Sequence, residues 1–571
     1  MCGIFGYIGK NCAKEKLIEG LENLEYRGYD SAGMAISDGE TISVFKSAGK
    51  VIKLKELLND KDAYGQVGIA HTRWATHGLP SELNAHPHIS LDKNVILVHN
   101  GIIENYTELK KTYTLKTKTQ ADTEVVAELI SKQSGTNFQK LKKTCELLKG
   151  SYALAVMFAE EPKTIYLAKK HSPLMIGTNK TEIYISSDAN AFKKYSNEFF
   201  ILNDNEFAII KDKNINFYKK NKKINKKINN FNENIEFKNK NKYLMQDEIL
   251  QTPDALIETE KYFQTNKKIF EKNYFSDLDK IYLIGCGTAY HSCLLGKKYL
   301  EKALSVPIFA EIASEFRYSN VSLTKNTLCI FVSQSGETAD TIACVKKSKR
   351  AKTLAITNAP NSSITFECKK TLYMRAGWER AVASTKAYTC QLAMFYLLKC
   401  YIKNETSKIK LVADKIRRYL KTMNIQDLID KCISFEKVIF IGRQADYVTS
   451  KESALKLKEI SYINCIACPS GELKHGTLAL VDEKTLVFVI STYNSLKAKN
   501  DMSLKEVEAR GGKCLLVSQF EGSQIKLPSI SQELMPMLCI IPFQILACEV
   551  SIKKGYNPDK PRNLSKSVTV E

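Results

Sequence analysis

The sequence lacks a long uninterrupted hydrophobic run. The most apolar late stretch, residues 538–550, is interrupted by Pro542 and Gln544. We expect it to be too short and too broken to span a bilayer. No basic segment followed by an apolar one comes after Met1, so no signal peptide is expected either. Both absences predict a cytoplasmic protein with no membrane partner.

Acidic residues are scarce relative to basic ones, 62 against 84, which leaves a net charge of +22. Such an excess is a feature of nucleic-acid binders. Much of it is local, however, because residues 211–242 hold eleven lysines and only three acids. This Lys/Asn-rich composition is more typical of a solvated linker than of a binding groove. We therefore expect no nucleic-acid partner, and a basic nucleic-acid binder remains an alternative.

The sixteen cysteines show no pairing pattern, and several lie in apolar runs. They are expected to be reduced thiols. Cys465 and Cys468 form a C-x-x-C with no second pair nearby, so neither a zinc site nor a redox site is predicted.

A chain of 571 residues is too long for one core. Residues 1–210 mix short β-type runs with an amphipathic helix whose apolar face carries Ala13, Leu17, Leu21 and Leu24. Residues 245–571 alternate apolar strands with helices, which predicts parallel βαβ units.

This C-terminal region looks duplicated. Residues 280–285 and 437–442 are strands that end in glycine, and each is followed by a long helix and a further strand, at residues 327–332 and 485–490. Two similar α/β domains are expected, with a boundary near residues 408–428.

Cys2 offers the first candidate chemistry. Removal of Met1 would place the Cys2 thiol beside a free α-amine, which titrates near pH ~8 and is able to act as its base. Dense polar clusters follow at residues 26–33, 71–78, 84–88, 99–101 and 121–124. A thiol that cleaves an amide needs a cation for the substrate carboxylate, an anion for its ammonium and donors for the oxyanion. Arg73, Asp122 and Asn100 with Gly101 are the candidates.

These motifs resemble the glutaminase domain of class II glutamine amidotransferases. The resemblance implies an N-terminal-nucleophile fold of two packed sheets between helices (αββα), with Cys2 as nucleophile and no metal. It implies that Asn100 and Gly101 form the oxyanion hole and that glutamine is bound. The residues expected to bind substrate are Arg73, Trp74, Thr76, His77, His86 and Asp122, with Trp74 gating the passage of ammonia.

A second candidate site lies at residues 333–338, Ser-Gln-Ser-Gly-Glu-Thr, at a strand-to-helix junction. Small hydroxyl residues, a glycine and a helix N-terminus suit an anion such as phosphate. The matching loop of the second repeat, residues 490–494, lacks this pattern, so one phosphate site per chain is expected.

The second repeat carries acid and base groups instead. Lys456 and Glu459 are three residues apart on a helix, and His475 follows in a Gly-Glu-Leu-Lys-His-Gly motif. Aldose–ketose isomerisation needs a carboxylate to carry a proton and a histidine to open the ring. Lys566 lies in an uncharged Ser/Val/Thr context, where a lowered pKa would favour a Schiff base.

The residue 333–338 loop resembles the signature of sugar isomerase (SIS) domains. Joined to the glutaminase motifs, it implies an amidotransferase that converts glutamine and D-fructose 6-phosphate into glutamate and D-glucosamine 6-phosphate. By resemblance, Glu459 moves the proton, His475 opens the ring, Lys566 forms the sugar imine and Lys456 belongs to the same catalytic set. No cofactor is implied, and the SIS halves are expected to pair into a homodimer. The sugar-binding residues are Cys286, Gly287, Thr288, Ser333, Gln334, Ser335, Thr338, Val382 and Ser384.

The expected organisation is α+β for the first domain and α/β with parallel sheets for the SIS domains. The boundaries are 1–210 for the glutaminase, 211–248 for the linker, 272–408 and 429–562 for the SIS domains, and 563–571 for a catalytic tail.

Two departures from the family pattern are present. Ala289 stands where a serine is usual, which predicts weaker binding of the sugar. Residues 378–380, Trp-Glu-Arg, replace a smaller sequence and are expected to reshape the pocket rim.

Alternatives remain. A phosphoribosyl-acceptor amidotransferase would need an acidic loop that we do not find. A sugar-phosphate sensor with an inactive glutaminase is disfavoured by the intact Cys2, Glu459, His475 and Lys566.

Overall fold

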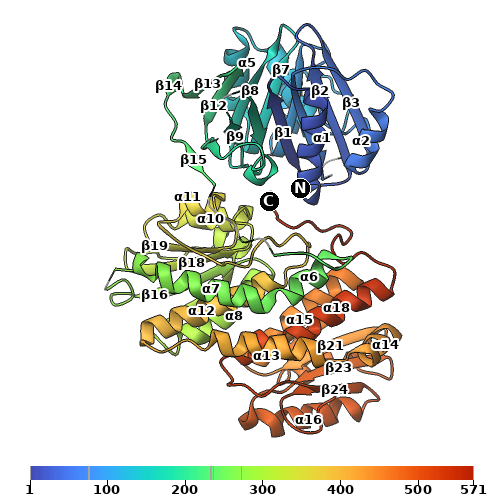
Figure 1. Cartoon of the computed structure of the whole chain (residues 1–571), viewed down its shortest axis with the longest axis vertical. Helices are drawn as coiled ribbons and strands as arrows, with labels where there is room; N and C mark the ends of the chain where they lie inside the picture. Colours follow the sequence, from blue (N-terminus) through green and yellow to red (C-terminus); the bar gives the residue numbers. More distant parts are fainter. Residues whose placement is uncertain are drawn as a thin grey trace. The chain divides into compact units, whose positions relative to one another are not determined.

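The computed structural model describes residues 2–74, 78–179, 181–231, 235, 237–271 and 273–569. The chain divides into two compact units, one formed by residues 1–232 with 567–571 and the other by residues 233–566. Each is described separately below (Figure 1).

The first unit is built on two antiparallel sheets. The eight-stranded sheet has the order β15 (Asn229–Asn230), β11 (Glu198–Ile201), β9 (Met175–Thr178), β10 (Ile183–Ser186), β1 (Gly3–Ile8), β4 (Val67–Arg73), β2 (Ser31–Ser37), β3 (Ile42–Ala48). The seven-stranded sheet has the order β14 (Lys222–Ile224), β13 (Asn214–Lys219), β12 (Glu206–Lys211), β8 (Glu161–Lys170), β7 (Gly150–Phe158), β6 (Val95–Ile103), β5 (His88–Ile89).

Alternation along the strands creates the layers. Phe5 of β1 faces outward and packs with Leu17 and Leu21 of α1 (Ala13–Leu24), while its neighbour Ile4 faces the second sheet and packs with Val98. The outer face of the second sheet is covered by α4 (Asp122–Lys132) and α5 (Asn137–Leu147). Because successive side chains on a strand point to opposite faces, each sheet has two buried sides. The expected αββα order is confirmed.

The Lys/Asn-rich stretch differs from the expected linker. Its first half forms β13 and β14, which add to one edge of the seven-stranded sheet through pairing with β12. Lysines on an edge strand discourage pairing with other chains. Protection of this sheet edge is therefore a reason for some of the lysines in this stretch that does not involve a nucleic acid.

The second unit holds two five-stranded parallel sheets with the same strand order. The first is β17 (Ile308–Ile312), β16 (Lys280–Gly285), β18 (Thr327–Ser333), β19 (Lys352–Thr357), β20 (Lys370–Tyr373). The second is β22 (Cys465–Pro469), β21 (Lys437–Gly442), β23 (Thr485–Ile490), β24 (Lys513–Ser518), β25 (Ile525–Lys526). The duplication and the parallel α/β architecture are therefore confirmed.

Corresponding helices follow corresponding strands. α8 (Thr288–Leu300) follows β16, and α15 (Ala445–Ser461) follows β21. A Cβ on Gly285 would lie 2.9 Å from the backbone of Ala289, and one on Gly442 would lie 2.7 Å from that of Asp446. Both glycines are needed because helix and strand approach so closely. One apolar core runs through both repeats.

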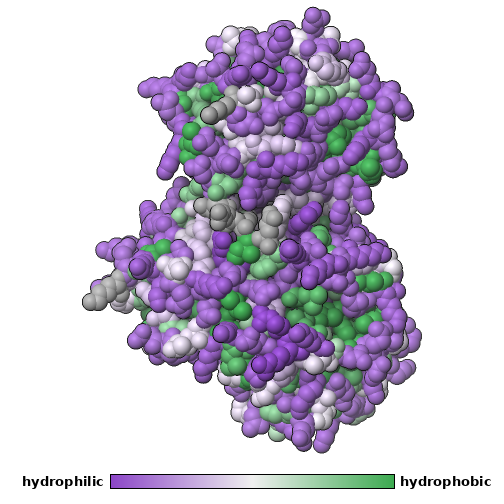
Figure 2. Space-filling model, viewed as in Figure 1, coloured by the Kyte–Doolittle hydropathy of each residue, from purple (hydrophilic) through white to green (hydrophobic). Residues whose placement is uncertain are grey.

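Helices α17 (Met535–Cys539) and α18 (Ile541–Lys553) form a stretch long and apolar enough to cross a membrane by length and composition. However, 83% of it is buried inside the fold, as expected of a core helix. In Figure 2 the visible face of both units is mainly hydrophilic, with apolar patches between the hydrophilic residues. A pocket beside α18 is lined by apolar residues such as Leu420 and Met423 together with polar ones such as Glu549.

Candidate active sites

Cys2 lies just before β1 and exchanges hydrogen bonds with the backbone of Trp74. Its Sγ accepts from the Trp74 N–H at 3.4 Å and lies 3.6 Å from the Trp74 carbonyl. Burial raises the pKa of the thiol, while the Trp74 backbone and the Arg73 guanidinium act in the opposite direction. A thiol with a raised pKa needs a nearby base to become a nucleophile at neutral pH.

Asn100 and Gly101 lie inside β6. Gly101 has φ +137°, and a Cβ there would come within 2.0 Å of the Ser151 carbonyl. Only glycine fits this position.

His71, which the sequence reasoning left without a specific role, fixes the Asn100 side chain. Its Nε2 lies 2.9 Å from the His99 carbonyl and 3.0 Å from Asn100 Oδ1. Both partners are acceptors, so Nε2 carries the proton and donates to them. Burial lowers the pKa of His71 to about 3, so the ring is neutral. Because Asn100 Oδ1 faces His71, the NH2 group of the Asn100 side chain points away from His71.

Asp122 is the first residue of α4, and its Oδ2 accepts the Ile103 N–H at 2.8 Å. Next to it, the Thr123 hydroxyl lies 3.0 Å from both His86 Nε2 and His99 Nδ1. Arg73 is 3% exposed, and the charges of Cys2 and Asp122 act on it. The structure thus brings Cys2, Arg73 and Asp122 into one electrostatic neighbourhood. Thr76 and His77 lie outside the described residues.

The buried histidines pack on one another, with 4.0 Å between the ring centroids of His71 and His86. Within the described ranges, no three His, Cys, Asp or Glu side chains are arranged to hold a metal ion. All sixteen cysteines are free thiols.

The loop after β18 has the compact geometry expected of an anion site. Ser333 Oγ accepts the Gly336 N–H at 3.0 Å and lies 3.0 Å from Thr338 Oγ1. α10 (Ala339–Lys347) begins directly after Thr338, so its free N–H groups face this loop. Glu337 faces the other way, where it accepts from the backbone and hydroxyl of Ser363.

Lys456 joins the two repeats. Its Nζ donates to Glu459 Oε2 at 2.7 Å and to Thr288 Oγ1 at 3.1 Å. Glu452, one helical turn earlier on α15, accepts from Thr288 and contacts His291. Burial alone would lower the pKa of Lys456, but Glu459 and Glu452 outweigh it and raise this pKa. The Lys456 side chain is 1% exposed and that of Glu459 is 22% exposed, so the pair is buried on the lysine side and partly accessible on the carboxylate side.

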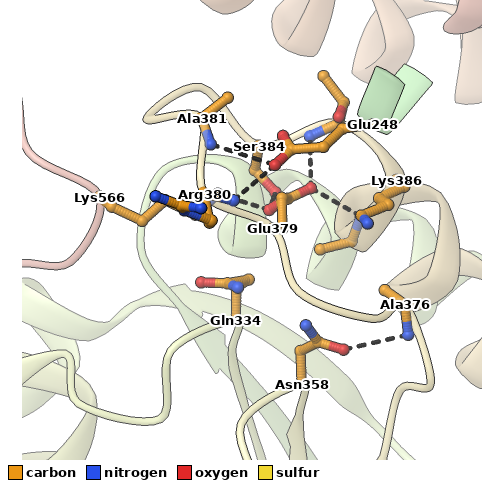
Figure 3. A network of polar contacts seen from close by, with 12 residues as sticks. Glu248, Gln334, Asn358, Ala376, Glu379, Arg380, Ala381, Ser384, Lys386 and Lys566 are labelled. Carbon is orange, nitrogen blue, oxygen red and sulfur yellow. Dashed lines mark hydrogen bonds and ion pairs between the residues drawn. The ribbon is translucent and has the colours of Figure 1, made fainter. Parts of the chain in front are cut away.

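Lys566 is not in an uncharged environment, contrary to the impression from its sequence neighbours. Figure 3 shows it meeting Glu379, with Nζ 2.6 Å from Oε2. Glu379 also accepts from Ser384 Oγ and from the Thr385 and Ala387 N–H groups at the start of α12 (Lys386–Lys403). These donors and Lys566 outweigh burial and lower the pKa of Glu379 to about 2. The carboxylate therefore fixes the position of Lys566 Nζ through a direct ion pair.

A second carboxyl lies beside this pair (Figure 3). Glu248, on α6 (Leu244–Leu250), accepts the N–H groups of Arg380 and Ala381 at 2.5 and 3.2 Å. Burial, together with the charge of Glu379, raises the pKa of Glu248 to about 8. Glu248 is therefore mainly neutral at pH 7. Its hydrogen bonds hold the backbone at Arg380 and Ala381, where the sequence departs from the family pattern.

The other residues predicted from the sequence make fewer contacts with the groups described above. His475 lies on an exposed 3-10 turn (Leu473–His475), and no hydrogen bond links its side chain to Glu459 among the residues described. Val382 contributes its N–H to the Asp559 carbonyl. Cys286 and Gly287 precede α8, and Cys286 Sγ lies 4.0 Å from Thr341 Oγ1. Ala289 is 8% exposed, at the edge of the core.

Sequence reasoning missed Glu379, Glu452, Glu248 and His71. Glu452 had a signal, because it lies one turn before Lys456 on the same helix face. His71 lies in the polar cluster 71–78 and Glu379 in the segment 378–380, but neither pattern indicated the partner, which is distant in sequence. Glu248 carried no signal.

Comparisons with known proteins cover the whole chain. The SIS domain profile matches residues 274–399 and 433–531, and that of the glutamine amidotransferase domain matches residues 71–194. Glutamine–fructose-6-phosphate aminotransferase (isomerizing) of Caldanaerobacter subterraneus subsp. tengcongensis is 42% identical, and that of Fusobacterium nucleatum subsp. nucleatum is 40% identical, with all of both chains covered in each case.

Among solved structures, the C-terminal domain of glucosamine-fructose-6-phosphate aminotransferase from Francisella tularensis matches with TM-score 0.51 and 34% identity. The match covers 56% of this chain and 99% of that one. The chain belongs to the family of isomerizing glutamine–fructose-6-phosphate aminotransferases.

Proposed function

We propose that this chain transfers the amide nitrogen of L-glutamine to D-fructose 6-phosphate, giving L-glutamate and D-glucosamine 6-phosphate. The observation that carries the proposal is the presence on one chain of two sets of residues: a half-buried thiol near Arg73 and Asp122, and a compact Ser/Thr loop together with the ion pair of Lys456 and Glu459.

In the first half-reaction, the α-amine of Cys2 takes the thiol proton. The sulfur then attacks the glutamine amide carbon and ammonia leaves. Arg73 holds the substrate carboxylate and Asp122 its ammonium. Asn100 and the Gly101 N–H stabilise the oxyanion. His71 acts as a positioning residue, because it orients the Asn100 amide. Water then hydrolyses the thioester to glutamate.

In the second half-reaction, the residue 333–338 loop binds the phosphate. Lys566 forms an imine at C2 of the opened sugar, and ammonia replaces it. Glu459 then carries a proton from C1 to C2. Glu379 positions Lys566, because its Oε2 accepts a hydrogen bond from Lys566 Nζ. His475 is assigned to ring opening by resemblance. Thr288, Val382 and Ser384 are assigned to the sugar.

Delivery of ammonia between the two half-reactions, pairing into a homodimer through the SIS domains and a cytoplasmic location remain predictions.

A paired assay tests the proposal. Wild-type protein and a Cys2→Ala variant receive fructose 6-phosphate with glutamine in one tube and ammonium in the other, and glucosamine 6-phosphate is measured. The variant should make product only from ammonium. Undiminished glutamine-dependent synthesis by the variant would refute Cys2 as the nucleophile. If wild-type protein makes product from neither nitrogen source, the assignment of the sugar acceptor is wrong.

A further inference from the structure

A second cavity in the SIS unit has no role in the proposed reaction. Its volume is about 420 Å³, and it lies between the C-terminal half of α8 and the start of α15. Lys298, Tyr299, Lys302, Gln444, Tyr493 and Glu533 are among the residues that line it. The volume is within the range of small-molecule sites.

The internal duplication makes this cavity the counterpart of the sugar site. Tyr299 and Lys302 are fourteen and seventeen residues after Gly285, and Lys456 and Glu459 are fourteen and seventeen residues after Gly442. The same comparison pairs Gln444 with Gly287, whose φ values are +57° and +53°. Tyr493, two residues after the first serine of its loop, matches Ser335. The cavity and the proposed sugar site therefore occupy equivalent positions in the two repeats and are lined by different side chains.

The loop of the second repeat is not available to a phosphate. Asp446, the counterpart of Ala289, accepts the Thr492 N–H at 2.8 Å and the Thr492 hydroxyl at 2.6 Å. The Tyr493 hydroxyl is hydrogen bonded to the Ala445 backbone at the start of α15. A fixed carboxylate thus occupies donors that the first repeat leaves for a ligand.

The cavity instead contains two lysines, Lys298 on α8 and Lys302 in the turn that follows it. Lys298 Nζ donates to Gln444 Oε1 at 2.7 Å, and among the described residues no carboxylate forms an ion pair with it. Lys302 lies 3.0 Å from Glu533, which also pairs with Lys399 at 3.2 Å. Lys302 is able to turn toward an anion without leaving Glu533 unpaired. Partial burial lowers the pKa of Lys298, and a bound anion would oppose this shift.

We propose that this cavity is a second, non-catalytic binding site for a phosphorylated sugar. Lys298 and Lys302 hold the phosphate, and Gln444, Tyr493 and Glu533 offer hydrogen bonds to the sugar hydroxyls. Lys302 stands in the position of Glu459 and is an ammonium that cannot accept the C1 proton, so the ligand binds without isomerisation.

Isothermal titration of the full chain with D-glucitol 6-phosphate tests this. The probe is an open-chain sugar phosphate without a carbonyl, so it does not react. We expect two binding events per chain. A K298A/K302A double variant should lose one of them or weaken it about tenfold or more, which corresponds to at least one charge-assisted contact. A Ser333→Ala variant should weaken the other.

Synthesis of glucosamine 6-phosphate at saturating substrate provides the folding control, since K298A/K302A should retain it. Lys297→Ala removes a charge from the same helix outside the cavity and should keep both events. A single binding event in the wild-type chain, or two unchanged events in K298A/K302A, would overturn the proposal. Equally tight binding of inorganic phosphate at the second site would overturn its sugar specificity.

Discussion

The two SIS repeats share a fold and differ in chemistry at most of the corresponding functional positions. Their sheets have the same strand order, and α8 and α15 pack on their strands through equivalent glycines. The first repeat keeps a loop of small hydroxyl residues, while the second closes its loop with Asp446. Conversely, α15 carries Glu452, Lys456 and Glu459, and the corresponding residues of the first repeat are Leu295 and Tyr299 on α8 and Lys302 just after it. In the proposed reaction, the first repeat would supply the phosphate-binding residues and the second repeat the acid/base residues.

The largest effect is expected from the acid/base half. Glu459→Gln should reduce synthesis from either glutamine or ammonium by a factor on the order of 10²–10⁴, because the amide cannot carry the proton. Lys302→Gln, the counterpart in the first repeat, should leave kcat unchanged. Steady-state assays of both variants measure the contrast. Glutamate release at Cys2 should persist in Glu459→Gln. Equal losses of synthesis in both variants would contradict the assignment of the acid/base residues to the second repeat.

A smaller effect is expected from the loops. Ser333→Ala should raise the KM for fructose 6-phosphate roughly tenfold to a hundredfold, through loss of a hydrogen bond to a charged group worth about 1.5–3 kcal/mol. Ser491→Ala is the matched change in the second repeat, where the hydroxyl accepts from Asn500. It should leave KM unchanged. If instead Ser491→Ala raises KM and Ser333→Ala does not, the phosphate site has been assigned to the wrong repeat.

The smallest effect concerns stability and Asp446. Burial raises the pKa of Asp446 from 3.8 to about 7, against the hydrogen bonds from Thr492. A carboxyl with a raised folded-state pKa binds its proton more tightly when folded, so its contribution is fully present below about pH 4 and is lost as the pH rises to about 7. Asp446→Asn keeps an acceptor for the Thr492 N–H and has no charge to lose.

Thermal unfolding at pH 5 and pH 8 measures this difference. The variant should gain stability relative to wild type between the two pH values, by on the order of 1–4 kcal/mol. A difference between variant and wild type that does not change with pH would show that the carboxyl of Asp446 is not titrating in the second loop.

Much of the fold followed from periodicity. The helix at residues 13–24 and the strands at residues 280–285, 437–442 and 485–490 agree with the structure because their apolar patterns match one face of a helix or a fully buried strand. The prediction of a linker for the Lys/Asn-rich stretch was wrong for its first half, because strands β13 and β14 lie there at a sheet edge. There, pairing with β12 supplies the order and little apolar surface is needed.

The candidate sites divide in the same way. Cys2, Ser333, Thr338, Lys456 and Glu459 belong to short local motifs, so their residue types and spacings were readable. The partners that set their protonation were not. Glu379 is 187 positions from Lys566, and Asn100 is held by a histidine 29 positions earlier.

The sequence by itself determined the antiparallel N-terminal region and the duplicated parallel α/β region, and it singled out Cys2 and the loop that suits a phosphate, because each of these patterns is encoded within a few neighbouring residues. Tertiary structure alone decided which charges meet. It paired Lys566 with Glu379, buried Glu248 beside them, and placed Asp446 where the second loop would otherwise bind an anion. The physical reason is that a charge in a folded protein is governed by burial and by neighbours within a few ångströms, and these neighbours come from distant parts of the chain.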